Sequence, residues 1–173
     1  QSFGTNSSGS RGTGIAIDSS DNIYITGQTS DGLDSNTNAG GLDIFLSKFN
    51  SSGTKQWTRQ LGGSADEVPW SLETDSSNNL YITGYTLGDL DGNTNLGSLD
   101  AFLIKYNSSG TKQWTKMIAS SQKERGYDVT VDSSGYIYVT GEEDETDYGG
   151  HDLFIVKYND LGSKIWTKKF GGN

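Results

Sequence analysis

The hydrophobic residues of this chain occur in short runs separated by clusters of Gly, Ser, Asn and Asp. The first run, 15–18, is short and alternating, and the second, 23–29, is rich in β-branched and aromatic residues. Two further runs follow at 43–49 and 56–61. β-Branched and aromatic residues favour strands, whereas Gly, Asn, Asp and Ser favour the turns between them. The pattern predicts four β-strands, and no stretch carries apolar residues at helical spacing.

This group of four predicted strands occurs three times. The segment IAIDSSDNIYITGQT at 15–29 returns as LETDSSNNLYITGYT at 72–86 and as VTVDSSGYIYVTGEE at 129–143. The later part of the unit repeats as DIFLSKFNSSGTKQWT, DAFLIKYNSSGTKQWT and DLFIVKYNDLGSKIWT. Self-similarity at a fixed period indicates a repeat architecture. Residues that recur in every copy are expected to form the scaffold, and residues that differ mark where a specific function could lie.

The third strand of each unit is apolar on both sides. In the second copy, Phe102, Ile104 and Tyr106 alternate with Ala101 and Leu103. A strand with one face in water would alternate apolar and polar residues, so each small sheet must be covered on both faces. Radially stacked four-stranded sheets meet this requirement. The predicted fold class is therefore all-β, a β-propeller built from four-stranded antiparallel blades.

The predicted domain organisation is a single β-propeller segment of three blades, each of about 52–57 residues. Blade 1 spans 12–63, blade 2 spans 64–120 and blade 3 spans 121–173. Residues 1–11 are expected to be the tail of a preceding blade, because their first residues resemble the end of blade 3. A propeller typically has four to eight blades. The chain is expected either to be an arc of a larger propeller or to be completed by oligomerisation.

Three sequence blocks recur in order in every unit: D-S-S-x-x-x-Y-[IV]-T-G, x-D-x-F-[LI]-x-K-[FY]-N and a closing W-T. They resemble the bacterial β-propeller repeat family called SBBP, for seven-bladed beta-propeller, over residues 12–172. The resemblance implies a propeller fold and a secreted or cell-surface location in a bacterium. The family looks like a set of exported proteins of mostly unassigned function, so it brings no catalytic residues to this chain.

Composition and charge narrow the functional classes. The net charge is −9 and the pI is near 4.4, whereas nucleic acid or an anionic membrane requires a basic surface, so neither is an expected partner. No apolar run approaches the roughly 20 residues that span a bilayer. The chain has no Cys, and its single histidine, His151, is expected to be incidental. No nucleophile elbow, phosphate loop or zinc spacing is present, so the chain is predicted not to be an enzyme.

Three sets of recurring polar or aromatic residues are predicted to be structural. The aspartate that ends the first strand can accept N–H bonds of the following turn. The lysine of the third strand needs a partner when partly buried, and an aspartate of its own blade is expected to supply a repeated ion pair. The tryptophan of the fourth strand is expected to pack between sheets, with a sugar-binding platform as the alternative. The sets are Asp18, Asp75 and Asp132; Lys48, Lys105 and Lys157, with Asp43, Asp100 and Asp152 or the first set as partners; and Trp57, Trp114 and Trp166.

The long loops between the second and third strands carry alternating oxygen ligands. These are Asp89, Asp91, Asn93 and Asn95 in the second copy and Asp34 and Asn36 in the first. Hard oxygen ligands gathered in this way are typical of calcium loops. However, Gly92 lies two places before the Gly of an EF-hand loop, and Asp, Asn and Gly also form ordinary turns. A calcium site and a plain structured turn both stay open, and calcium is the only cofactor that the sequence suggests.

Two aromatic residues stand at the start of the innermost strand, near the mouth of the central channel. Trp70 and Tyr127 occupy equivalent positions in blades 2 and 3, Arg11 and Arg125 neighbour them, and Glu67 lies in the same connection. Aromatic rings there could stack on a sugar or grip a peptide, or they could plug the channel. These five residues form the predicted ligand site.

The predicted function is a non-enzymatic exported or surface β-propeller, acting as a scaffold or recognition module with ligand contacts on the long-loop face. One alternative is a carbohydrate-binding, lectin-like propeller, and another is a structural subunit of a surface layer or filament. A third is a propeller glycosidase or lyase that uses Glu67, Glu142 or Glu143. The expected partner is protein, through self-association or further blades of a parent chain, with a glycan as a further possibility.

Overall fold

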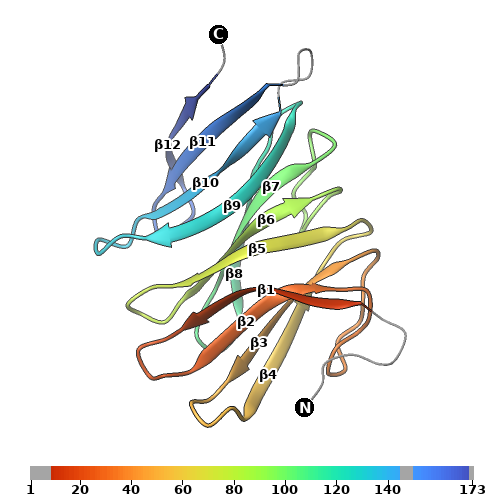
Figure 1. The fold of residues 1–173 in the computed structure, drawn as a ribbon, viewed down its shortest axis with the longest axis vertical. Coiled ribbons are helices and arrows are strands. Elements are labelled where there is room, and N and C mark those ends of the chain that lie inside the picture. The colour runs from red at the N-terminus through yellow and green to blue at the C-terminus, as the bar shows by residue number, and fades with distance from the viewer. Residues whose placement is uncertain (1–8, 145–149, 172–173) are drawn as a thin grey trace.

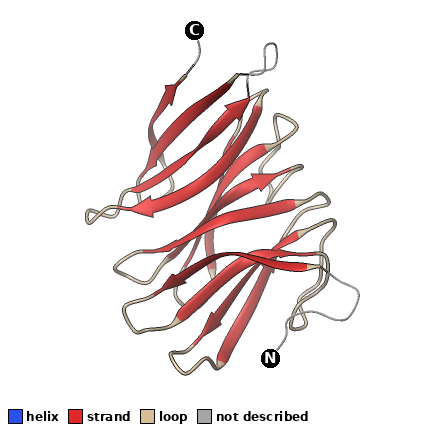
Figure 2. Ribbon diagram, viewed as in Figure 1, coloured by secondary structure: helices blue, strands red, loops and turns tan. Residues whose placement is uncertain are grey.

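The computed structural model describes residues 9–144 and 150–171 (Figure 1), and these contain β-strands and no helix (Figure 2). Within this part of the chain there is accordingly no helix that could cross a membrane. The strands are β1 (Ser10–Ile17), β2 (Ile23–Thr29), β3 (Asp43–Phe49), β4 (Lys55–Leu61), β5 (Glu67–Thr74), β6 (Leu80–Thr86), β7 (Asp100–Tyr106), β8 (Lys112–Ile118), β9 (Lys123–Val131), β10 (Ile137–Asp144), β11 (His151–Tyr158) and β12 (Lys164–Phe170).

Each set of four consecutive strands forms one antiparallel sheet. The first strands β1, β5 and β9 lie side by side, and the later strands of the sheets splay apart (Figure 1). This is how propeller blades are arranged around an axis, with the first strand innermost. The structure confirms the all-β fold class and the three four-stranded blades. Most of the predicted tail of a preceding blade, residues 1–8, lies outside the described residues.

The first strand of blade 1 is longer than its hydrophobic pattern predicts. It was expected at 15–18, but β1 begins at Ser10, and a register shift between Gly12 and Gly14 interrupts its pairing with β2. The residues before Ile15 are small or polar and show no apolar alternation. Backbone pairing with β2, which does carry a clear strand pattern, extends the strand through them.

The hydrophobic core lies between the blades. One cluster joins blades 1 and 2 and includes Leu46, Leu80 and Phe102, and a second joins blades 2 and 3 and includes Leu103 and Phe154. Every residue of β7 in the middle blade is buried, in agreement with its two-sided apolar pattern. Burying one such side chain contributes about 1.5–3 kcal/mol. Stacking of the blades therefore stabilises each sheet.

The aspartate that ends each first strand organises the following turn. Asp18 Oδ1 accepts hydrogen bonds from two backbone N–H groups of this turn at 2.9 Å each, and its Oδ2 accepts one from the Tyr24 hydroxyl at 2.9 Å. Asp75 and Asp132 bind their turns and tyrosines in the same way. One short carboxylate thus links the first strand, the turn and the second strand in each blade.

The third-strand lysines have partners other than the predicted ones. Lys105 pairs with Asp160 of blade 3, and Lys48 Nζ lies 3.5 Å from a backbone carbonyl of blade 2. The three ammonium groups also lie over the tyrosine ring of their own second strand, 5.1, 5.5 and 5.0 Å from its centroid. The prediction of own-blade ion pairs is wrong for these two lysines, because their side chains reach across to the next blade. For Lys157, a hydrogen bond with the tyrosine of its own blade raises its pKa, and the charge of Asp132 adds to this effect.

Candidate functional site

Three positions in each blade carry different side chains on the repeated scaffold. They lie on the first and second strands, at places that pair across the sheet, as in Arg11 with Gln28, Val68 with Tyr85, and Arg125 with Glu142. The first strands of neighbouring blades are adjacent, so these side chains share one side of the arc, which we call the channel-mouth surface. Its members are Arg11, Thr13 and Gln28; Val68, Trp70 and Tyr85; and Arg125, Tyr127 and Glu142.

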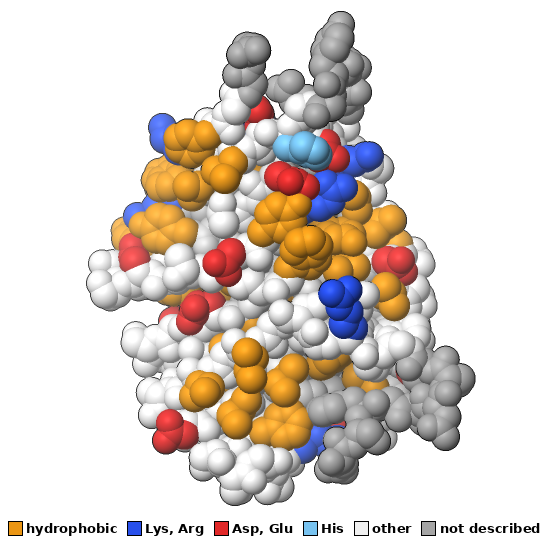
Figure 3. All heavy atoms as spheres, in the orientation of Figure 1, with side chains coloured by type: hydrophobic (Ala, Val, Ile, Leu, Met, Phe, Trp, Pro, Cys, Tyr) orange, Lys and Arg blue, Asp and Glu red, His pale blue; other side chains and the backbone are white. Residues whose placement is uncertain are grey.

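An aromatic ledge formed by Trp70, Tyr85 and Tyr127 occupies the middle of this surface. The rings of Trp70 and Tyr127 have their centroids 4.8 Å apart at an interplanar angle of 36°, and Tyr85 meets Trp70 edge-on at 6.2 Å. Trp70 nevertheless keeps 42% of its surface exposed. Beside the ledge is a hollow of about 480 Å³ that Arg11 and Asp66 also line. Figure 3 shows hydrophobic side chains gathered at the centre of this face.

A network of charged groups lies at the blade 3 end of the ledge. The Arg125 guanidinium donates to Glu142 at 2.8 Å and to Asp144 at 3.2 Å. Burial, followed by a hydrogen bond to Glu142, raises the pKa of Tyr127 to about 12, so its hydroxyl stays neutral. Partial burial acts to raise the pKa of Asp144, but bonds from His151 and Arg125 outweigh it and lower that pKa. The ledge is therefore bordered by ionised groups that are already paired.

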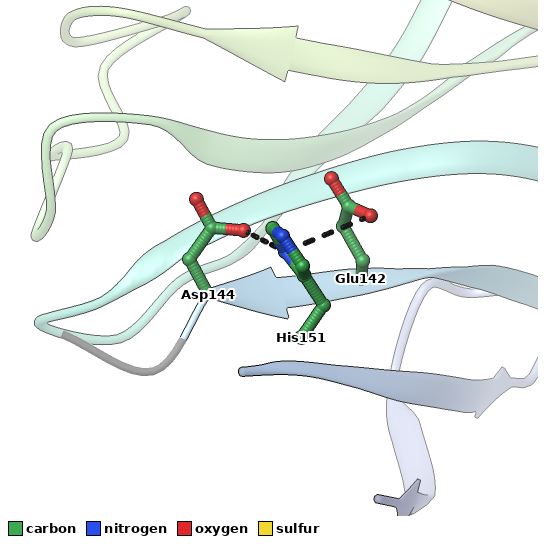
Figure 4. Close-up of side chains that lie close together, drawn as sticks. All are labelled: Glu142, Asp144 and His151. Atoms are coloured by element: carbon green, nitrogen blue, oxygen red, sulfur yellow. Dashed lines mark hydrogen bonds and ion pairs between the residues drawn. The ribbon is translucent and has the colours of Figure 1, made fainter. Parts of the chain in front are cut away.

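Glu142, Asp144 and His151 form the one group of potential metal ligands found in the described part of the chain. Their ligand atoms all lie within 4.8 Å of one another, and His151 Nδ1 is 2.6 Å from Asp144 (Figure 4). β10 supplies the two carboxylates and the start of β11 supplies the histidine. Because Arg125 already bonds to both carboxylates, the protein itself compensates the charge that would attract a cation. His151 is thus part of an ionic network, which its isolation in the sequence did not predict.

Glu67 does not belong to the channel-mouth surface. It is fully buried, and it accepts hydrogen bonds from the Gly63 backbone at 2.7 Å and the Thr86 hydroxyl at 2.9 Å. Burial, together with the charges of Asp43 and Asp66, raises its pKa to about 7. The prediction that Glu67 contacts ligand is wrong, because side chains alternate along β5 and Glu67 points into the junction between blades. Arg11, Trp70, Arg125 and Tyr127 do come together.

The residues predicted to bind calcium are engaged within their own blades. Asp91 pairs with Lys112 and Asp34 with Lys55, and Asp89 accepts a bond from the Asn95 backbone at 2.8 Å. The amide groups of Asn36, Asn93 and Asn95 donate to backbone carbonyls. These bonds hold the loop against the fourth strand, with Asp34, Ser35, Asp91 and Gly92 at positive φ. Calcium binding stays a prediction.

A second hollow lies between blades 2 and 3 and was not predicted. It measures about 580 Å³, and it is lined by apolar Leu96, Ile118 and Phe154 and by charged Glu124, Glu143 and Lys169. We call it the blade 2–3 slot. Burial, with the charges of Asp100 and Glu143, raises the pKa of Glu124 to about 7. Glu124 is the repeat equivalent of Glu67, so the same buried carboxyl occurs at both junctions and is part of the scaffold.

Among the described residues, the carboxyl groups at the channel mouth form no pair suited to glycoside hydrolysis. Glu142 and Glu143 are consecutive on β10, so their side chains point to opposite faces of the sheet. Glu142 pairs with Arg125, and Glu143 pairs with Lys169. Asp144, on the same face as Glu142, has a lowered pKa, whereas a general acid needs a raised one.

Sequence reasoning missed Gln28, Asp66 and Tyr85, which also line the hollow beside the ledge. The sequence does contain a signal for Gln28 and Tyr85. The second-strand block reads ITGQT, ITGYT and VTGEE in the three copies, so the position of Gln28, Tyr85 and Glu142 is the variable one inside a recurring stretch. Asp66 lies in a connection whose sequence differs at most positions, and only the structure identifies it.

Comparison with known proteins agrees with this architecture. The family model described as beta-propeller repeat, SBBP, matches residues 1–34, 56–91 and 113–148. The chain is similar to an uncharacterized WD repeat-containing protein of Acanthamoeba polyphaga mimivirus, with 25% identity over 152 residues, which is 73% of this chain and 11% of that protein. It is also similar to the regulatory protein FlaEY of Caulobacter vibrioides, with 25% identity over 175 residues, which is 86% of this chain and 18% of that protein. The chain thus spans a small part of either relative and corresponds to a repeat-based binding or scaffold module.

Proposed function

Because the chain belongs to the SBBP beta-propeller repeat family, we propose that it is a non-enzymatic recognition module that binds a polypeptide segment of a partner protein at the aromatic ledge. The observation that carries this proposal is Trp70, which stacks on Tyr127 at 4.8 Å and yet remains 42% exposed. A large aromatic ring that could be buried but is presented at the surface is a typical binding feature.

The composition of the surface favours a polypeptide as ligand. Trp, Tyr and Arg are the residues that dominate binding energy in protein interfaces, and the channel-mouth surface combines one Trp, two Tyr and two Arg from three blades. Arg11 and Asp66 beside the hollow can bond to backbone or polar side chains of a bound segment. The neighbouring rigid strands hold these groups in place before binding, which lowers the entropy cost.

A carbohydrate is the second candidate ligand. The exposed ring of Trp70, together with the polar groups of Gln28 and Asp66 in the same hollow, is also suited to stacking on a sugar ring and bonding to its hydroxyls.

An exported or cell-surface location of this protein in a bacterium is also part of the proposal, and it rests on the family resemblance. A surface-layer or filament subunit would instead use the open ends of the arc.

The test is a binding screen of the chain against a random peptide library and a glycan array. We expect peptides to be enriched, and we expect Trp70→Ala to weaken their binding by about 10- to 100-fold, as for loss of a central hot-spot residue. Leu87→Ala is the matched control, because Leu87 is 48% exposed and does not line the hollow; it should bind like the wild type.

Enrichment of glycans alone, with the same loss in Trp70→Ala, would replace the peptide proposal by the lectin one. Binding that survives both Trp70→Ala and Tyr127→Ala would overturn the ledge as the site. Substrate turnover lost in Glu142→Gln would contradict the non-enzymatic function.

A further inference from the structure

Each first strand of this protein contains one β-bulge, and the bulged residue belongs to the channel-mouth surface. The pairing of the first strand with the second shifts register at one place in every blade, and the residues passed over are Thr13, Trp70 and Tyr127. A bulge re-aims a side chain and is common next to functional sites. Blades 2 and 3 direct an aromatic ring to the channel mouth in this way, whereas blade 1 directs a polar side chain there.

Blade 1 contributes buried polar atoms without partners to the hollow beside the ledge. Among the described residues, Thr13 Oγ1 and Gln28 Oε1 are buried and form no hydrogen bond, and both residues line the hollow. Buried polar atoms in folded proteins almost always have a partner, so an unpaired one requires an explanation. A rotation about the side-chain bonds would turn either atom towards a group bound in the hollow, which would supply the partner.

Arg11 is an exposed cation that lines the same hollow. Its equivalent in blade 3, Arg125, pairs across the sheet with Glu142 at 2.8 Å and also bonds to Asp144. Arg11 pairs across the sheet with Gln28, which carries no charge, and it forms no ion pair within the part of the chain that the structure describes. Arg11 thus has the position of Arg125 without its compensating carboxylates, and an anionic group of a ligand would complement its charge.

One acidic residue, Asp66, also lines the hollow, and its contacts are with the scaffold. Its Oδ1 accepts a hydrogen bond from the Leu42 backbone N–H at 2.8 Å, and its backbone carbonyl accepts one from the Leu87 N–H at 3.0 Å. A Cβ on Gly41 would lie 2.0 Å from the same Oδ1, so the loop before β3 passes closely over this carboxylate. Asp66 therefore holds the wall of the hollow together and does not pair with Arg11.

We propose that the hollow beside the ledge recognises a carboxylate of the bound polypeptide. The carboxylate pairs with Arg11, a neighbouring N–H of the segment donates to Gln28 Oε1, and an adjacent aromatic or large apolar side chain stacks on Trp70. A guanidinium binds a carboxylate through two parallel hydrogen bonds, and the Thr13 hydroxyl can donate a third. This inference rests on the proposed function and adds the chemistry of the partner, which is an acidic side chain or a chain terminus beside an apolar residue.

The test compares three pools of octapeptides that carry a neutral fluorophore at the N-terminus and have neutral residues at all variable positions. The first pool contains adjacent phenylalanine and glutamate in both orders, and the second has glutamine in place of the glutamate; both are amidated at the C-terminus. The third pool contains no glutamate and ends in phenylalanine with a free carboxylate. Fluorescence anisotropy at low salt measures the Kd of each pool. We expect the glutamate pool to bind at least about tenfold more tightly than the glutamine pool.

Gln28→Glu is the sharpest variant, because it builds in blade 1 the arginine–glutamate pair that blade 3 already has. It should compensate Arg11 and abolish the preference for the glutamate pool, and Arg11→Gln should do the same. Lys164→Gln changes the net charge by the same amount and is the matched control, because Lys164 is exposed and lies on β12 outside the hollow. It should keep the preference of the wild type, with circular dichroism confirming that each variant folds.

Equal binding of the glutamate and glutamine pools, lost in Trp70→Ala, would overturn carboxylate recognition and leave the proposed function intact. A preference that survives both Gln28→Glu and Arg11→Gln would also overturn it, because the carboxylate would then bind elsewhere. Binding of no pool would overturn the proposed function and this inference together. A free-terminus pool that binds as tightly as the glutamate pool would support a chain terminus as the source of the carboxylate, and weaker binding of that pool would support an acidic side chain.

Discussion

The two junctions between blades use the same scaffold but are filled differently. At the junction of blades 1 and 2, Leu90 is fully buried in the hydrophobic cluster that the two blades share. Leu90 belongs to the loop between the second and third strands of blade 2. In blade 3, the corresponding loop between the second and third strands has six residues (145–150) in place of thirteen (87–99) and contains no leucine. At the junction of blades 2 and 3 the blade 2–3 slot opens, lined partly by Glu124, Glu143 and Lys169.

The comparison shows that the two junctions share their scaffold residues and differ in the side chains that lie between the blades. Both junctions keep a buried glutamate, which is Glu67 or Glu124. Both also keep a turn whose glycine, Gly110 or Gly162, lies against the tryptophan of the preceding blade. The side chains between the blades differ. Leu90 completes the packed core of one junction, whereas the other has a hollow that is lined partly by charged residues.

The largest effect is expected from removing the Leu90 side chain. Leu90→Ala should lower the free energy of unfolding by about 3 kcal/mol, since a fully buried leucine is replaced by a cavity. Urea unfolding followed by tryptophan fluorescence measures the change.

Leu96→Ala in the same loop is the control for Leu90→Ala, because Leu96 is 62% exposed; its cost should stay below about 0.5 kcal/mol. Equal losses in the two variants would show that Leu90 has no special part in the first junction.

The next largest effect concerns pH and the buried glutamates that the junctions share. Burial raises the pKa of both Glu67 and Glu124 from 4.5 to about 7. A raised carboxyl pKa means that the folded state favours the proton, so this stability is complete below pH 4.5 and is lost as the pH rises towards 7. Each residue should contribute about 2–3 kcal/mol to this loss. Urea midpoints between pH 4.5 and 8 should fall for the wild type.

Glu67→Gln should remove about half of this pH dependence, and Glu124→Gln should remove the other half. Glu73→Gln is the control, because Glu73 lies on β5 and bonds to the Thr74 backbone outside the junction; it should keep the wild-type slope. A wild-type midpoint that rises between pH 4.5 and 7 would contradict the raised pKa values.

The scaffold of each blade could be predicted from the sequence, whereas the contacts between blades could not. The recurrence of Asp18, Tyr24 and Trp57 identified the scaffold because one geometry is repeated with one set of residues. The partner of Lys105 could not be predicted because it lies in the next blade. The sequence of a single repeat does not show how neighbouring sheets are offset from each other. Trp70 and Tyr127 were found because equivalent positions in adjacent blades come together, whereas Glu67 was misplaced by one step of strand alternation.

The smallest effect should come from the third-strand lysines, which reach different partners at the two junctions. Lys105, 6% exposed, pairs with the Asp160 carboxylate, whereas Lys48 reaches only a carbonyl of blade 2 at 3.5 Å. Lys105→Met should therefore cost about 1 kcal/mol, and Lys48→Met should cost less than about 0.5 kcal/mol. Both variants lose a similar contact with a tyrosine ring, so that contribution cancels.

The effect of Lys105→Met is limited because Asp160 is mostly exposed, and water can solvate its carboxylate once the lysine is gone. A double-mutant cycle with Asp160→Asn isolates the pair, since Asn keeps the backbone carbonyl that Lys105 and Trp114 also contact. We expect the coupling free energy in urea unfolding to be about 0.5 kcal/mol and to shrink in 1 M salt, because screening weakens an exposed pair. A coupling of zero at low salt would contradict a stabilising ion pair between Lys105 and Asp160 at the second junction.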